Sequence, residues 1–163
     1  MRYYRVTCYY MPLILTFNFI IMAHVFHEVI EPYSIEQMFA LVNDIARYPQ
    51  FVPDCIATGI ISKQDNYLTA FIEVEKLGFK KSFTTINQIN EPHSIDMALI
   101  DGPFKHLKGR WEFTELDGQK SKISLNLNFE FNNKLMSAVF TPIFKEVMTN
   151  MVNAFSQRAR QIY

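Results

Sequence analysis

The sequence predicts an α+β domain in which an antiparallel sheet has one face covered by a long C-terminal helix. Segment 122–131 (KISLNLNFEF) alternates strictly, so one face of this strand is apolar and the other polar: the apolar face carries Ile123, Leu125, Leu127, Phe129 and Phe131. Segment 134–163 repeats apolar residues at steps of three and four or their sums, which indicates an amphipathic helix. A sheet with one oily face needs a cover, and this helix is long enough to supply it.

The N-terminal part of the domain predicts one strand followed by two short helical segments. Residues 24–31 form the strand, and Pro32 ends it because proline cannot continue a ladder. Ser34 and Gln37 have the spacing of a capping box, which predicts a helix over 35–44. A second helical turn is expected over 45–51, where prolines break it.

Six strands follow, separated by short turns. Their expected ranges are 55–63, 67–76, 79–89, 94–100, 105–116 and 122–131. Short turns between consecutive strands imply antiparallel pairing. In the last helical segment, Thr141 is predicted as the N-cap and Pro142 as the first residue of the main helix, preceded by a short turn or helix.

Composition favours one domain with a large core. The chain has 163 residues, of which 49% are apolar and 20% charged, so disorder is excluded. The 16 basic and 16 acidic residues cancel, so no overall field recruits nucleic acid or anionic membrane. Cys8 and Cys55 have no metal or redox spacing, and a reducing compartment is expected.

The first 21 residues differ from the rest. The apolar run 11–25 is short for a membrane span and is interrupted by Pro12 and Asn18, so no stable membrane insertion is expected. A secretory signal is a second interpretation, but no convincing cleavage site lies near Ala23. We favour a third, in which Met22 is the true initiator, 1–21 is an extension and 22–163 is the single domain.

Five segments carry a resemblance to a known family: EPYSIEQMFALVNDIARYPQFVPDC at 31–55, FTT at 83–85, DGPFKHLKGRWEF at 101–113, LNFEFNNKLMSAVF at 127–140 and MVNAFSQRA at 151–159. They resemble the coenzyme-Q-binding START-like family of the polyketide cyclase/Bet v 1-like superfamily, and in particular its bacterial ribosome association toxin (RatA) branch. The resemblance covers 24–163. It implies the helix-grip fold, in which a curved antiparallel sheet wraps around the terminal helix.

The resemblance also implies two functions. Mitochondrial members hold ubiquinone (coenzyme Q) in a cavity between sheet and helix and support respiration. The bacterial branch binds the large ribosomal subunit and blocks subunit joining, as the toxin of a type II toxin-antitoxin system with an antitoxin partner. A cytoplasmic location is expected, with contact to the inner membrane for a quinone carrier. No cofactor is implied apart from a bound quinone or lipid.

No catalytic or metal-ligating residue can be assigned from the sequence. The common hydrolase, metalloprotease and nucleotide-binding motifs are absent. His24 and His27 fall on opposite faces of a strand, which is poor ligand geometry. Glu73 and Glu75 near three lysines indicate a solvated cross-strand charge pattern. The enzymatic alternative, a polyketide cyclase or aromatase, would need polar groups inside the cavity.

A ligand pocket is predicted between the last two strands and the terminal helix. The expected lining residues are Trp111, Phe113, Leu127, Phe129, Phe131, Phe140, Phe144, Val147 and Met151. Burial of apolar ligand surface at about 25 cal/mol per Å² would give affinity with few polar contacts. The same residues would equally form an ordinary packed core, and periodicity alone leaves both interpretations open.

A basic surface is the predicted site of ribosome contact. Its candidate residues are Lys76, Lys80, Lys81, Lys105, Lys108 and Arg110. Such a patch can contact RNA phosphates even at zero net charge. A sheet edge that lysines protect from aggregation is the competing interpretation.

Overall fold

A computed structural model describes residues 22–163 of the chain, and the expectations for residues 1–21 lie outside this range. The elements run β1 (Ala23–Glu31), α1 (Ile35–Asn43), the 3-10 helix η1 (Ile45–Gln50), β2 (Cys55–Gln64), β3 (Tyr67–Lys76), β4 (Phe79–Asn90), β5 (Ser94–Asp101), β6 (Phe104–Leu116), β7 (Lys120–Phe131) and α2 (Lys134–Ile162). Each predicted strand lies within two residues of an observed one.

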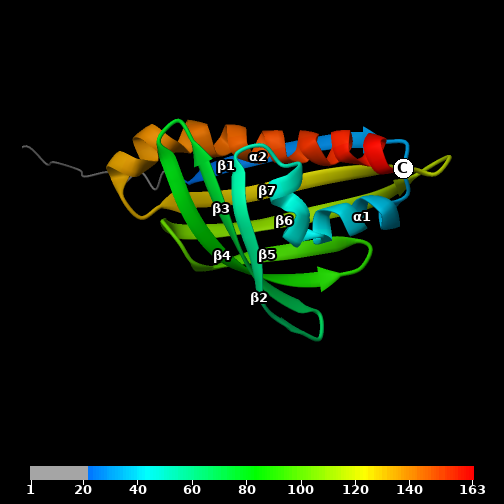
Figure 1. Cartoon of the computed structure of the whole chain (residues 1–163), viewed down its shortest axis with the longest axis horizontal. Helices are drawn as coiled ribbons and strands as arrows, with labels where there is room; N and C mark the ends of the chain where they lie inside the picture. The colour runs from blue at the N-terminus through cyan, green and yellow to red at the C-terminus, as the bar shows by residue number, and fades with distance from the viewer. Residues whose placement is uncertain (1–21) are drawn as a thin grey trace, which may run out of the picture.

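The strands form a seven-stranded sheet in the order β1-β7-β6-β5-β4-β3-β2, and every neighbouring pair is antiparallel. The first strand therefore pairs with the last, and β1 and β2 form the two edges. Figure 1 shows α2 lying along the sheet beside β1 and β7, with α1 near the end of α2 that carries the C-terminus. The predicted α+β architecture with a helix-covered sheet is confirmed.

The alternation in β7 and the apolar stripe of α2 meet as the sequence predicts. The five apolar side chains of β7 from Ile123 to Phe131 are each at most 2% exposed. On α2, Phe144, Val147 and Val152 are completely buried. The oily face of the sheet and the oily stripe of the helix therefore share one core, whose burial is the main stabilising contribution to the fold.

The predicted break at Thr141 and Pro142 is wrong, because α2 is one continuous helix that includes Pro142. Its N-cap is Asn133, whose Oδ1 accepts hydrogen bonds from the backbone amides of Leu135 at 2.8 Å and Met136 at 3.2 Å. A proline inside a helix leaves the carbonyl four residues earlier without its partner. Here that residue is Ala138, which is exposed like Pro142, so water can replace the lost hydrogen bond.

Side-chain contacts hold both α-helices in place. The predicted capping box forms: the amide of Gln37 donates to Ser34 Oγ, and the amide of Ser34 donates to Gln37 Oε1. Lys76, at the end of β3, donates to Glu146 of α2 at 2.8 Å and to Asp54 at 3.1 Å. At the C-terminus, the Tyr163 hydroxyl donates to the Gln37 carbonyl at 3.1 Å. The helix over the sheet is thus tied to β3 near its middle and to α1 at its end.

Candidate functional site

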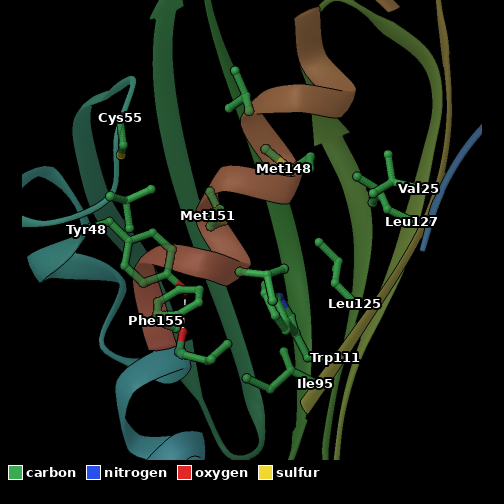
Figure 2. Close-up of a cluster of buried hydrophobic side chains, with 14 of the residues drawn as sticks. Val25, Tyr48, Cys55, Ile95, Trp111, Leu125, Leu127, Met148, Met151 and Phe155 are labelled. Carbon is green, nitrogen blue, oxygen red and sulfur yellow. Dashed lines mark hydrogen bonds between the residues drawn. The ribbon is translucent and has the colours of Figure 1, made fainter. Parts of the chain in front are cut away.

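A cavity lies between the sheet and α2. Strand β4 contributes Phe83, Thr85 and Asn87 to its lining, and α2 contributes Phe144, Met148 and Met151. Figure 2 shows Met151 of α2 near Trp111 of β6 and Tyr48 of η1, with the ring of Phe155 in contact with both Tyr48 and Trp111. The cavity is small, with a volume of about 50 Å³. This is room for a few water molecules or a small ligand group.

The structure divides the nine predicted pocket residues into two groups. Four line the cavity: Trp111, Leu127, Phe144 and Met151. The other five are not part of the described lining and pack elsewhere in the core or against it: Phe113, Phe129, Phe131, Phe140 and Val147. Phe113, for example, makes an edge contact with Phe39 of α1 at a ring distance of 5.4 Å. Alternation and helical periodicity identify inward-facing positions, and most inward-facing positions are filled by packing.

Most of the remaining phenylalanines belong to an aromatic cluster near the N-terminal part of α2. We use this name for Phe79, Phe83, Phe104, Phe129, Phe131, Phe140 and Phe144. Phe144 lies at its centre, with ring centroids 4.8 Å from Phe129 and 5.0 Å from Phe104. Sheet and helix are packed tightly here, so the cavity lies farther along α2, at the level of Met148 and Met151.

Besides Tyr48, three polar side chains that the sequence analysis did not identify line the cavity: Asn43, Thr85 and Asn87. The last two are buried. Thr85 and Asn87 are 6% and 4% exposed, and Thr85 Oγ1 donates to Asn87 Oδ1 at 2.9 Å. They follow Phe83 at steps of two on β4 and therefore share its inward face. The alternation with Phe83 could have identified both residues as inward-facing. It is easily missed, because polar residues in a strand are usually assigned to the solvent-exposed face.

Acid–base chemistry has few candidate groups in the cavity. Among the described lining residues, Tyr48 is the only titratable one. Its hydroxyl donates to the Val42 carbonyl, and burial raises the pKa of Tyr48 well above its usual value. The phenol therefore stays protonated at neutral pH. Within residues 22–163, no group of three or more His, Cys, Asp or Glu side chains is arranged to hold a metal ion.

Most of the predicted basic surface is paired with carboxylates. Lys80 lies 3.6 Å from Glu73 and 3.5 Å from Glu75, which confirms the cross-strand charge pattern. Lys105 pairs with Glu130. Arg110 Nη1 donates hydrogen bonds to both carboxylate oxygens of Asp96. Lys76 is bound by Asp54 and Glu146.

Two of the six candidate cations differ from the rest. Lys81 and Lys108 are exposed, and no carboxylate of residues 22–163 lies within 4.0 Å of their amines. They are therefore the members of the basic surface with the most charge available to a partner.

Across the part of the chain that the structure describes, no helix has the length and apolar character to cross a membrane.

The geometry defines a START/Bet v 1-like helix-grip protein. An aromatase/cyclase, Zhui, from Streptomyces sp. R1128 superposes with a TM-score of 0.75 at 17% identity, covering 86% of this chain and 94% of that one. A START superfamily protein from Mycobacterium smegmatis gives a TM-score of 0.74 at 20% identity, covering 86% and 99%. At these identities the similarity shows the fold alone.

Sequence comparison identifies the family. Residues 32–156 match the family described as polyketide cyclase / dehydrase and lipid transport, and the chain belongs to it. The ribosome association toxin RatA of Vibrio cholerae is 46% identical over 142 residues, which cover 87% of this chain and 99% of that protein. RatA of Escherichia coli K12 is 45% identical over 144 residues, covering 88% and 91%.

A mitochondrial relative is more distant. The coenzyme Q-binding protein COQ10 homolog B of Xenopus laevis is 31% identical over 135 residues, covering 80% of this chain and 55% of that protein. The resemblance found in the sequence to the START-like family and its RatA branch is therefore confirmed.

Proposed function

We propose that this chain associates with ribosomes, acting in the cytoplasm by binding the large subunit and blocking its joining to the small one. The observation that carries the proposal is the 46% identity to a ribosome association toxin over 99% of that relative's length. A toxin of this kind would be controlled by an antitoxin partner.

The proposed contact surface is basic, because ribosomal RNA presents phosphates on the subunit surface. A Lys or Arg that contacts a phosphate releases a counterion, so the affinity depends strongly on salt. Lys81 and Lys108 are free to make such contacts, whereas a cation already held by a carboxylate has part of its field cancelled. We assign the larger share of RNA binding to Lys81 and Lys108, and a smaller share to Lys76, Lys80, Lys105 and Arg110.

Reversing the two unpaired cations should remove ribosome binding. The Lys81→Glu/Lys108→Glu variant is expected to cosediment with large subunits at least tenfold less than the wild type in a low-salt sucrose gradient. The matched control is Lys63→Glu/Lys120→Glu, which makes the same change in charge at two other exposed lysines. Equal cosedimentation of the two folded variants would discard this surface, and a wild type that stays at the top of the gradient would discard ribosome association.

A second candidate function is the binding of an uncharged lipophilic molecule, such as a ubiquinone-like compound, in the cavity. The observation that favours it is an apolar space whose described lining contains no charged side chain. Met97, Met148 and Met151 supply flexible thioethers, which let a pocket adapt to irregular ligands. A relative named for coenzyme Q binding adds support. Since about 50 Å³ cannot hold an isoprenoid tail, these side chains must move to admit one.

Native mass spectrometry of protein purified from its own host tests this second candidate. We expect a bound neutral lipid in the wild type and its loss in Met151→Phe, because a larger ring at that position fills the cavity. Met136→Phe, on the same helix but not among the described lining residues, is the control and should retain the adduct. An adduct of unchanged intensity in Met151→Phe would place the lipid elsewhere, and no adduct in any sample would reject carriage.

We propose a binding role for the cavity, with no catalysis. A cyclase or aromatase moves protons during ring closure, and the described lining offers only the hydroxyl of Tyr48 as a titratable group. Thr85 and Asn87 are polar but neutral. Relatives named as toxins or as a coenzyme Q-binding protein agree with this assignment.

A further inference from the structure

We infer that Thr85 and Asn87 form a recognition site for the polar group of an uncharged ligand, one that carries a ketone, quinone or ester carbonyl on an apolar body. The inference rests on the second proposed function, ligand binding in the cavity, and goes beyond it by naming the residues and the chemical class. It depends on the unused hydrogen-bonding capacity of these two buried side chains.

The direction of the Thr85–Asn87 hydrogen bond determines what the pair can offer. The Thr85 hydroxyl donates to Asn87 Oδ1, so the carboxamide oxygen of Asn87 is engaged. The Asn87 amide nitrogen carries two further donors, and the hydrogen bonds found among residues 22–163 include no acceptor for them. The residue is nevertheless 96% buried, and it lines the cavity. Among residues 22–163, the buried side-chain atoms without a hydrogen-bond partner are Ser121 Oγ and Ser156 Oγ, so the Asn87 amide nitrogen keeps some accessible surface. A ligand oxygen that covers this surface would also pair with the nitrogen.

Trp111 adds a second donor of the same kind. Its indole N–H has no acceptor among the described hydrogen bonds, and its side chain lines the cavity from β6. The register places Asn87 opposite Met97, and Ile95, two residues before Met97, opposite Trp111. The two donors therefore lie on the same inner face of the sheet, two residues apart along the strands and on either side of β5. A ligand with one or two acceptor oxygens fits this arrangement.

The same groups argue against other ligand classes. A fatty acid carboxylate would lose its hydration without a counter-charge, because the described lining contains no Lys, Arg or His. A pure hydrocarbon would cover these donors without pairing them. A neutral carbonyl compound meets both conditions, since its oxygen accepts a hydrogen bond and it carries no charge.

The wall beside Asn87 can move to make room. Gly109 is the residue opposite Met97 on β6, and a Cβ there would meet Met97 Cε at 2.8 Å and Leu127 Cδ1 at 2.6 Å. The ends of two flexible side chains therefore occupy the space above a residue without a side chain. Because both line the cavity, their rotation would widen it next to the two donors.

Three probes of similar size and different chemistry test the inference. Delipidated protein is titrated with hexanophenone, hexylbenzene and 6-phenylhexanoate, with the emission of Trp111, the single tryptophan, as the readout and calorimetry as a check. We expect the ketone to bind roughly tenfold tighter than the hydrocarbon, as one added hydrogen bond to a buried donor would give, and the carboxylate to bind weakest.

The decisive variant is Thr85→Val/Asn87→Leu, which replaces both partners with apolar groups of similar shape. It is expected to lose the tenfold preference for the ketone, to keep its affinity for hexylbenzene and to melt no lower than the wild type, because two buried polar groups are gone. Thr85→Ser keeps the hydroxyl and should keep the preference. Asn87→Leu alone serves as the second test if the double variant does not fold.

The possible failures are distinguishable. Binding of hexylbenzene as tightly as hexanophenone, or a tenfold preference that survives in the folded Thr85→Val/Asn87→Leu variant, would overturn this inference and leave lipophile binding intact. Tight binding of 6-phenylhexanoate would also overturn it. Binding of none of the three probes would overturn the inference together with the proposed cavity function.

Discussion

Replacing Phe144 with alanine is expected to destabilise the domain by about 3–5 kcal/mol, the usual loss for a buried phenylalanine. Phe144 is completely buried, and it joins α2 to the sheet through the aromatic cluster. Its ring lies 4.8 Å from Phe129 and 5.8 Å from Phe83, so the substitution removes contacts to β7 and β4 together. It would also enlarge the cavity that Phe144 lines, which adds to the cost.

Urea unfolding followed by circular dichroism measures this effect. The control is Leu135→Ala, at the start of the same helix, where the side chain is 74% exposed and the expected change is below about 0.5 kcal/mol. A loss at Phe144 as small as that at Leu135 would mean that α2 is not anchored through the aromatic cluster. Both variants truncate a side chain of α2 to alanine, so the difference between their free energies of unfolding reports the effect of burial.

Gly102→Ala is expected to cost on the order of 2–5 kcal/mol, combining backbone strain with overpacking. Gly102 has φ +145°, a conformation that side chains disfavour, and a Cβ there would lie 2.7 Å from the Cβ and 3.2 Å from the Cα of Phe83. The Cα and Cβ atoms of Phe83 are fixed to the backbone, so they cannot move aside unless β4 shifts. Both the aromatic cluster and the cavity wall would be displaced.

Gly78→Ala separates the two contributions. Gly78 also has a positive φ, +80°, but an added Cβ would meet no atom within 4 Å, so only the conformational cost of about 1 kcal/mol remains. The free energy of unfolding from urea titrations should therefore fall clearly more for Gly102→Ala than for Gly78→Ala. Equal losses at the two glycines would show that β4 and the β5–β6 connection yield to the added methyl group.

The arrangement of the fold could be predicted from local patterns. The alternation in β7 identifies its inward face, and the stripe on α2 identifies the partner of that face, so the layer order follows from two segments. Pro142 shows the limit of such reasoning. Proline usually marks a helix boundary, but an exposed position lets water satisfy the carbonyl that it leaves free, and exposure depends on the tertiary structure.

The candidate sites were less predictable, because both depend on cross-strand neighbours. The sequence predicts the pairing of Lys80 with Glu73 and Glu75. It does not predict that strand register also places Asp96 beside Arg110. The inward position of Asn87 follows from its alternation with Phe83 on β4, but its place beside a cavity does not. Whether an inward residue borders a void or a neighbouring ring is decided by packing, which periodicity does not contain.

The contact between Tyr163 and Gln37 has a practical consequence for experiments with this protein. The ring of Tyr163 also lies 5.7 Å from that of Tyr33, so the terminal residue is part of the packing between α2 and the N-terminal part of the domain. An affinity tag or fluorescent fusion attached directly behind Tyr163 would strain this junction. Fusions for pull-down or imaging should therefore place a flexible spacer after Tyr163, and their melting temperature should be compared with that of the untagged chain.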